Sequence, residues 1–227
     1  AMCTNIIQSL DGTVDKYIGD SVMAFWNAPE DCENHELKAC QAALACQEQM
    51  VLFNAKNKAD GLPYLKMRIG ISTGTVFVGN IGSSDRLNYT AVGDTVNLAS
   101  RLEGTNKTYK TCILISDKTQ ASIRGTILTR PVDKVAVKGK ANAILMYEVL
   151  ALGKDETPEL RKIMDLTVLG FEHYLAQRFQ QAIDCYQQIL GFNKGDHLAL
   201  FYIERCKGFL VFPPSSDWDG VHISNSK

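Results

Sequence analysis

The 227-residue sequence lacks the features that mark several large classes of protein. Its 24 lysines and arginines nearly balance 25 aspartates and glutamates, so the formal charge is only -1. Such a balance gives no electrostatic reason to expect a nucleic-acid or membrane-surface partner, and any phosphate site must be local. The sequence contains no signal peptide and no apolar run of membrane-spanning length, so we expect a cytoplasmic location.

The cysteine pattern gives no disulfide framework and no metal site. The seven cysteines form no Cys-x-x-Cys pair, and an odd number cannot all pair within one chain, so we expect reduced thiols. Cys32, His35, Cys40 and Cys46 are potential zinc ligands, but their helical, alanine-rich spacing favours small buried packing residues, and we assign no zinc. The Walker and Rossmann glycine motifs, which form the commoner phosphate cradles, are also absent.

Hydrophobic periodicity and turn residues predict an α+β sheet domain in the first two thirds of the chain. We expect a hairpin of strands 13–18 and 21–26 with Asp20 at its tip, and a second strand pair around Gly74. Interleaved strands and covering helices are typical of an α+β sheet. The expected helices are 2–10, 32–58 and 117–123, and the other strands are 65–72, 75–80, 87–92, 111–115, 126–137 and 144–150.

After a polar segment at 155–158 the pattern changes to helices alone. We expect two antiparallel helices within 166–190, with a tetratricopeptide-like spacing, and a third helix at 198–210. One such repeat cannot bury both of its faces, so it should dock on the sheet domain, on a second copy, or on a segment absent from this chain. We therefore divide the chain into a sheet domain, 1–152, and a helical extension with a tail, 153–227.

The segment from Arg86 to Arg101 is the most informative part of the sequence. It runs from a β-rich stretch through Gly93 into a helix that Asp94 or Thr95 can cap, and it puts Asn97 and Arg101 four residues apart on that helix. Side chains at this spacing project side by side from one face. An asparagine can orient a hydroxyl and an arginine can grip phosphate oxygens, so the pair suits a sugar and a phosphate.

Four motifs occur together in one order and carry a resemblance to a known family. They are Asp15-Lys16-Tyr17-Ile18-Gly19-Asp20, Arg68-Ile69-Gly70-Ile71-Ser72-Thr73-Gly74, the segment from Tyr89 to Arg101, and Val137-Lys138-Gly139-Lys140. Over residues 1–150 the chain resembles a class III nucleotidyl cyclase catalytic domain. The resemblance implies a ferredoxin-like core. It also implies a head-to-tail homodimer with two composite active sites. In each site one chain binds the metals and the other chain supplies the remaining groups.

The resemblance implies a reaction assisted by two Mg²⁺ or Mn²⁺ ions, in which the ribose 3′ oxygen attacks the α-phosphate. Asp20 matches the second metal-binding aspartate of the family. The first should lie in a strand reading Phe-x-Asp-Ile-x-x-Phe-Thr about forty residues earlier, and the chain has no such sequence. Because the chain begins at Ala1 within a helix, we interpret it as a fragment with a sensory or membrane region upstream. Because the first metal-binding aspartate is absent, we expect the fragment to be inactive or weakly active.

The remaining site residues follow from the same motifs. Lys16 and Thr90 match the purine-selecting positions, where Lys16 can donate to adenine N1 and Thr90 can accept from N6. Guanylyl cyclases usually carry Glu and Cys there, so the pair indicates the ATP-using type, including the subclass often stimulated by bicarbonate. Asn97 matches the residue that orients the ribose, Arg101 the one that stabilises the α-phosphate in the transition state, and Lys138 the one that meets the terminal phosphates.

Three alternative functions follow from the same residues. The sequence Gly70-Ile71-Ser72-Thr73-Gly74 fits the nucleophile elbow of α/β hydrolases, but that elbow needs a helix directly after it, and 75–78 reads as strand. A catalytically incomplete dimerisation or nucleotide-binding scaffold is the second alternative. A guanylate cyclase is the third. The strand at 75–78 disfavours the hydrolase. The filled catalytic positions argue against the scaffold, and Lys16 with Thr90 favours an adenylate over a guanylate cyclase.

Overall fold

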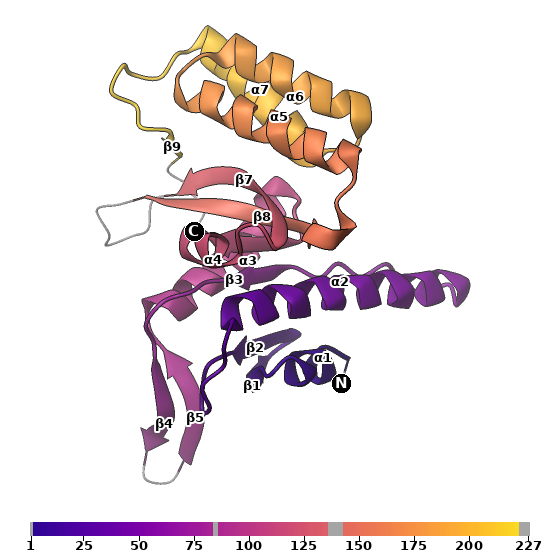
Figure 1. Ribbon diagram of the computed structural model, residues 1–227, viewed down its shortest axis with the longest axis vertical. Helices are drawn as coiled ribbons and strands as arrows, with labels where there is room; N and C mark the ends of the chain where they lie inside the picture. The colour runs from indigo at the N-terminus through magenta and orange to yellow at the C-terminus, as the bar shows by residue number, and fades with distance from the viewer. Residues whose placement is uncertain (1, 84–85, 136–142, 223–227) are drawn as a thin grey trace.

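A computed structural model describes residues 2–83, 86–135 and 143–222. A five-stranded sheet in the order β3-β6-β8-β7-β9 lies between two layers of helices (Figure 1). Its strands are β3 (Ile69–Ile71), β6 (Ile113–Ser116), β7 (Ile127–Val135), β8 (Ile144–Leu152) and β9 (Val221–His222). β3 runs parallel to β6 and β9 parallel to β7, whereas β8 is antiparallel to both of its neighbours. The mixed sheet with covering helices confirms the α+β prediction.

Strand β6 shows how the sheet divides two cores. Its residues are buried throughout, as expected of a strand covered on both faces. Because successive side chains point to opposite faces, Ile113 and Ile115 join one core and Leu114 joins the other. The first core lies under α2 (His35–Ala59) and α4 (Asp117–Ile123). The second lies under α3 (Asp94–Tyr109) and the C-terminal helices.

Helix α2 contributes small side chains to the first core. Cys40 and Ala43 pack against the isoleucines of the sheet, and Cys40 is fully buried. Burial raises the pKa of Cys40 to about 12, because the thiolate is disfavoured away from water. Cys46 is buried on the same helix. These positions confirm the expected packing role of the helical cysteines.

The helical extension consists of α5 (Pro158–Leu175), α6 (Phe179–Phe192) and α7 (His197–Val211), which follow a short 3₁₀ turn, η1 (Gly153–Asp155). Thr157 accepts the backbone N–H of Leu160 and so caps α5, which begins with a proline at its first turn. α5 packs against α6 and α6 against α7, in a layer over β7 (Figure 1). Of the three docking partners considered from the sequence, the structure shows the sheet of the same chain.

The extension and the sheet share one hydrophobic core. Val132 and Met146 of the sheet and Leu102 of α3 pack in the same cluster as the aromatic residues of α5–α7. Tyr202 Oη donates to the carbonyl of Val132 at 2.6 Å, and Arg130 Nη1 donates to Asp196 Oδ2 at 2.6 Å. This extension is therefore packed into the domain rather than tethered to it.

Two smaller hairpins stand apart from the main sheet. β1 (Thr13–Ile18) pairs with β2 (Ser21–Phe25) beside α1 (Met2–Ser9), which confirms the predicted hairpin. β4 (Phe77–Ser83) pairs with β5 (Arg86–Val92) in an arm that projects from the body (Figure 1).

The predicted pairing of 65–72 with 75–80 around Gly74 is wrong. β3 and β4 lie in different sheets, because β4 forms a seven-residue antiparallel ladder with β5, whereas the three residues of β3 pair with β6. The strand is also shorter than predicted. Asn54 on α2 exchanges hydrogen bonds with the backbone of Leu65, and Gln47 donates to the carbonyl of Met67, so helix side chains satisfy this segment in place of a neighbouring strand.

Candidate functional site

The structure brings Lys16 and Thr90 together, although 74 positions separate them in sequence. Lys16 lies on β1 and Thr90 on β5, and Lys16 Nζ donates to Thr90 Oγ1 at 2.9 Å. Thr90 is only 6% exposed, whereas the Lys16 side chain is 41% exposed. A partly exposed cation beside a buried hydroxyl can present a hydrogen-bond donor and an acceptor to a ligand.

A carboxylate that the sequence interpretation missed lies under this pair. The Asp15 side chain is 1% exposed, and its Oδ2 accepts from Thr90 Oγ1 at 2.5 Å and from the backbone N–H of Ala91 at 3.3 Å. Asp15 precedes Lys16 in the motif that carried the family resemblance, which was the available signal.

Asp20 lies at the tip of the β1–β2 hairpin, as predicted. It follows Gly19, whose φ of 62° suits a residue without a Cβ, and it is exposed. In the parts of the chain that the structure describes, no group of three His, Cys, Asp or Glu residues is placed to hold a metal ion. One exposed carboxylate does not make a complete site for a hard cation, which takes several oxygen ligands. Asp20 therefore fits as one ligand of a metal site whose other ligands the described residues do not supply.

Asn97 and Arg101 lie on α3 and are both exposed. Among the described residues neither side chain takes part in a hydrogen bond or an ion pair, so both are available to a ligand. The expected capping by Asp94 or Thr95 is wrong, because the N-cap is Gly93, which makes no side-chain bond. Thr95 Oγ1 instead donates to the carbonyl of Thr75 at 3.3 Å and ties the first turn to the chain before β4.

Helix α3 is held against β3 at very close range. A Cβ at Gly70 would lie 2.1 Å from the carbonyl oxygen of Ala99 and 2.3 Å from the backbone nitrogen of Glu103. Asn106 is fully buried and donates to the carbonyl of Ile69 at 3.0 Å. Gly70 and Asn106 therefore fix the helix that carries Asn97 and Arg101, and the sequence interpretation missed both.

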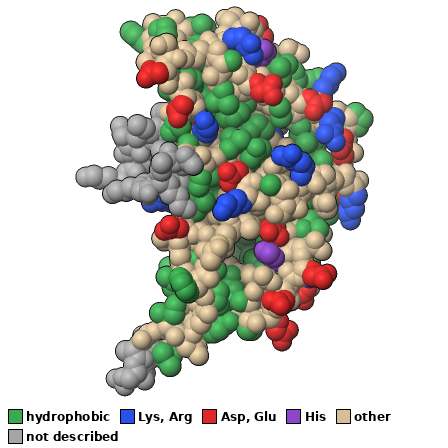
Figure 2. Space-filling view, turned by 60° about the vertical axis from the view of Figure 1, so that its left-hand side comes forward, with side chains coloured by type: hydrophobic (Ala, Val, Ile, Leu, Met, Phe, Trp, Pro, Cys, Tyr) green, Lys and Arg blue, Asp and Glu red, His purple; other side chains and the backbone are tan. Residues whose placement is uncertain are grey.

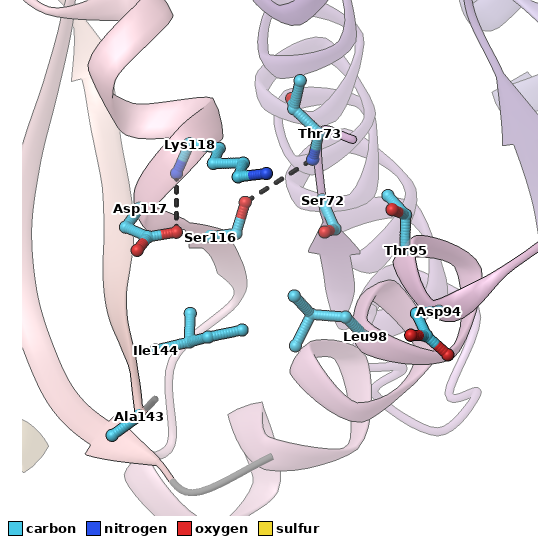
Figure 3. A pocket seen from close by; sticks show the side chains of 10 residues that line it. All are labelled: Ser72, Thr73, Asp94, Thr95, Leu98, Ser116, Asp117, Lys118, Ala143 and Ile144. Carbon is cyan, nitrogen blue, oxygen red and sulfur yellow. Dashed lines mark hydrogen bonds between the residues drawn. The ribbon is translucent and has the colours of Figure 1, made fainter. Parts of the chain in front are cut away.

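A cavity of about 190 Å³ opens beside the start of α3, between the ends of β3 and β6 (Figure 3). Its polar lining is rich in hydroxyls, and Ser116 Oγ accepts the backbone N–H of Thr73 at 3.5 Å. None of the described residues predicted for the site lines it, and Lys138 lies outside the described residues. The lining is Ser72, Thr73, Asp94, Thr95, Leu98, Ser116, Asp117, Lys118, Ala143 and Ile144.

The hydrolase alternative has no support in this geometry. After Gly74 the next element is the strand β4, whereas a nucleophile elbow leads into a helix. Ser72 Oγ is buried and has no hydrogen-bond partner among the described residues, so it lacks the adjacent base that activates a serine.

The chain belongs to the family described as the adenylate and guanylate cyclase catalytic domain, whose model matches residues 4–151. It is 44% identical over 149 residues to Adenylate cyclase 1 of Rhizobium meliloti (strain 1021), a match that covers 66% of this chain and 22% of that protein. The matches to the first three curated relatives cover between 9% and 29% of their lengths.

Solved cyclase structures share the fold. The adenylyl cyclase CyaB from P. aeruginosa superposes with a TM-score of 0.59 at 31% identity, covering 69% of this chain and 78% of that chain. The guanylyl cyclase Cya2 superposes with a TM-score of 0.55 at 30% identity, covering 68% of this chain and 78% of that one. No helix within the described ranges is both long enough and apolar enough to cross a membrane.

Proposed function

We propose that this chain is the catalytic part of an adenylate cyclase, which converts ATP to 3′,5′-cyclic AMP and pyrophosphate for signal transduction. The observation that carries the proposal is the 2.9 Å contact between Lys16 Nζ and Thr90 Oγ1. Adenine presents an acceptor at N1 and a donor at N6, and this pair can meet both. The 44% identity to Adenylate cyclase 1 of Rhizobium meliloti supports the same substrate.

The roles of the α3 residues come from the family resemblance, and their exposure leaves both side chains accessible to a ligand. Asn97 orients the ribose, and Arg101 places its guanidinium on the α-phosphate, where negative charge builds in the transition state. Lys138, outside the described residues, is assigned to the terminal phosphates on sequence alone. Mg²⁺ or Mn²⁺, two per site, would assist the attacking and leaving oxygens, and Asp20 is the one described residue assigned to them.

A homodimer with composite sites is part of the proposal. The β4–β5 arm exposes large apolar side chains, and Figure 2 shows hydrophobic side chains gathered along it. Two-stranded ribbons are marginally stable alone, so an arm of this kind calls for a covering surface. A second copy, arranged head to tail, covers the arm and brings its own Asp20 toward Arg101 of the first. The exposed residues are Phe77, Ile81, Leu87, Tyr89 and Val92.

A nucleotide-binding scaffold is the second candidate. Asp20 is the one carboxylate among the described residues that is assigned to metal, and a two-metal reaction needs more ligands, which favours the scaffold.

We also propose that the chain divides into a cyclase domain, 1–152, and a tetratricopeptide-like extension, 153–227. Both parts contribute side chains to one hydrophobic core.

A nucleotide assay separates these candidates. The chain and a longer chain that carries a Phe-x-Asp-Ile-x-x-Phe-Thr strand are incubated with ATP or GTP and with Mg²⁺ or Mn²⁺, and cyclic nucleotides are quantified. We expect cyclic AMP from the longer chain and little from the shorter one. Nucleotide binding by both chains with no cyclic product from either establishes the scaffold, and cyclic GMP as the main product establishes a guanylate cyclase.

A second experiment tests base selection within this function. Lys16→Glu combined with Thr90→Cys should shift preference toward GTP, because a glutamate accepts from guanine N1–H where a lysine can only donate. Unchanged preference would remove base selection by these two residues from the proposal.

A further inference from the structure

Lys16 can only donate, so it suits the N1 acceptor of adenine, but Thr90 by itself adds no preference at position 6 of a purine. A threonine hydroxyl both donates and accepts, so it can turn to meet either an amino group or a carbonyl at position 6 of a purine. The direction of the Thr90 hydroxyl therefore decides which group the site accepts at position 6. The contacts of Asp15 determine that direction.

Asp15 accepts the hydrogen bond that the Thr90 hydroxyl donates. Thr90 Oγ1 donates to Asp15 Oδ2 at 2.5 Å, and an ionised carboxylate accepts only. The Asp15 side chain is 1% exposed, and the backbone N–H of Ala91 at 3.3 Å and Lys16 Nζ at 3.3 Å from Oδ1 complete its set of donors. The Thr90 hydroxyl donates its one hydrogen to Asp15, and one of its two lone pairs accepts from Lys16 Nζ. The second lone pair is free for a ligand and can only accept.

A bulge in β1 makes this arrangement possible. Consecutive residues of a regular strand point to opposite faces, so Asp15 and Lys16 would not both reach Thr90. The register of β1 against β2 shifts between Val14 and Lys16, where one extra residue is accommodated. Bulges of this kind re-aim side chains next to functional sites. The extra residue, Asp15, and the next residue, Lys16, consequently both contact Thr90.

We propose that Asp15 is a specificity-determining positioning residue, which holds the Thr90 hydroxyl as an acceptor so that the site reads a 6-aminopurine and rejects a 6-oxopurine. Lys16 has a further N–H for the ring nitrogen, and Thr90 accepts from the adjacent amino group. A guanine edge offers the reverse order, a ring N–H and a carbonyl oxygen, and meets a donor with a donor. This inference rests on the proposed function, because it assumes that the purine lies on this pair.

The test compares binding of ATP, GTP and inosine triphosphate, as fluorescent methylanthraniloyl derivatives, to the 227-residue chain and its variants. Inosine has the same 6-oxo edge as guanine without the 2-amino group, so it isolates the contact in question. Wild-type protein should bind ATP at least about tenfold more tightly than either 6-oxopurine, since an unmatched buried polar group loses at least that much affinity. Asp15→Asn keeps the shape but can donate to Thr90, and it should reduce this preference toward equality.

Matched variants separate this role from a structural one. Thr90→Ser keeps the hydroxyl and should keep the preference. Thr90→Val should lose the part of the preference that arises at position 6, and adding Asp15→Asn to Thr90→Val should change the ratio no further. An unchanged ATP preference in folded Asp15→Asn overturns the inference. If Asp15→Asn does not fold, tight binding of inosine triphosphate to the wild type overturns it equally. Absence of binding of all three nucleotides to the wild type contradicts the proposed function instead.

Discussion

Arg205 on α7 donates to Asp133 on β7, with 2.6 Å between Nη1 and Oδ2, and the Asp133 side chain is fully buried. Tyr109, at the end of α3, donates to the same carboxylate oxygen. One buried carboxylate therefore joins the helical extension, the sheet and the helix that carries Asn97 and Arg101. Burial is the largest effect on the pKa of Arg205 and lowers it, but Asp133 and the neighbouring tyrosines together hold the pKa above its ordinary value.

Replacing Arg205 should destabilise the fold strongly. Arg205→Ala leaves the Asp133 carboxylate buried without its cation, and breaking a buried pair in this way costs about 3–5 kcal/mol. We expect a loss of that size in the free energy of unfolding measured in urea. The control is Lys207→Ala on the same helix, which breaks an exposed pair with Glu204 and should cost less than about 1 kcal/mol. Equal losses in the two variants would contradict the stabilising role of the buried pair.

Replacing Gly70, which packs against α3, and Gly104, which lies within α3, by alanine should change the free energy of unfolding in opposite directions. Gly70→Ala drives a Cβ into the backbone of α3, so the strand and helix must separate, at a cost of about 1–3 kcal/mol. Gly104 lies within α3 with open space around it, and Gly104→Ala should add about 0.5–1 kcal/mol by favouring the helix. Urea unfolding measures both. A neutral Gly70→Ala would show that β3 and α3 do not pack this tightly.

Stability should fall in alkaline solution. Burial raises the pKa of Tyr109, Tyr174, Tyr186 and Tyr202 above 10, and raises the pKa of Cys206 to about 12. A raised folded-state pKa gives stability that is present below the unfolded value and is lost as pH rises through the folded value. The free energy of unfolding should therefore decline from about pH 9, steepening above about pH 10 by about 1.4 kcal/mol per pH unit for each tyrosine.

Urea titrations between pH 8 and pH 11, with tyrosinate absorbance as a second readout, check this decline. Tyr109→Phe should reduce its slope by the share of one tyrosine. The exposed Tyr64 provides the control, because Tyr64→Phe should leave the slope unchanged. A slope that does not change in Tyr109→Phe would contradict the stabilising role of the buried phenol.

The β4–β5 arm should determine self-association. Phe77 is 82% exposed, so Phe77→Asp should change the stability of the monomer by no more than about 0.5 kcal/mol. Placed in an interface between copies, the new charge should weaken the dimer at least about tenfold, which sedimentation equilibrium measures. Phe212, 80% exposed on the helical extension, offers a matched control in Phe212→Asp. A dimer weakened only by Phe212→Asp would move the interface to the extension.

Local sequence patterns predicted much of this fold because they reflect local physics. The Gly19-Asp20 turn, the helix at 117–123 and the closing pair of β7 and β8 are decided by neighbouring residues, and all three are found where they were expected. The pairing of β3 could not be predicted in this way. Its partner β6 is more than forty residues away, and its flanking segment is held by α2 side chains.

The candidate site, like the fold, could be predicted only in part from the sequence. The motifs predicted which residues are present, and the structure added the reason that two of them meet, since Thr90 reaches Lys16 only through the approach of β5 to β1. The motifs gave Asp15 no role of its own, and alternation along a regular strand would direct it away from Lys16. A one-residue bulge reverses that expectation, and a bulge has no reliable signature in a single sequence.

Arg101 is the residue assigned to stabilising the transition state. Its side chain is exposed on α3 and makes no ion pair within the described part of the chain, so Arg101→Ala should leave the free energy of unfolding within about 0.5 kcal/mol of the wild type. In a longer chain with cyclase activity, the same change should lower kcat about 100-fold to 1,000-fold, because it removes a preorganised charge from the α-phosphate. KM for ATP should change far less.

Two variants make the measurement specific. Arg101→Lys keeps the charge but loses the planar fork of donors, and it should recover only part of the lost kcat. Lys107→Ala, further along the exposed side of α3, should leave both kinetic constants unchanged. If Arg101→Ala raises KM with kcat intact, Arg101 serves ground-state binding, because uniform binding of substrate and transition state affects KM alone. Unchanged kcat and KM would remove Arg101 from the site.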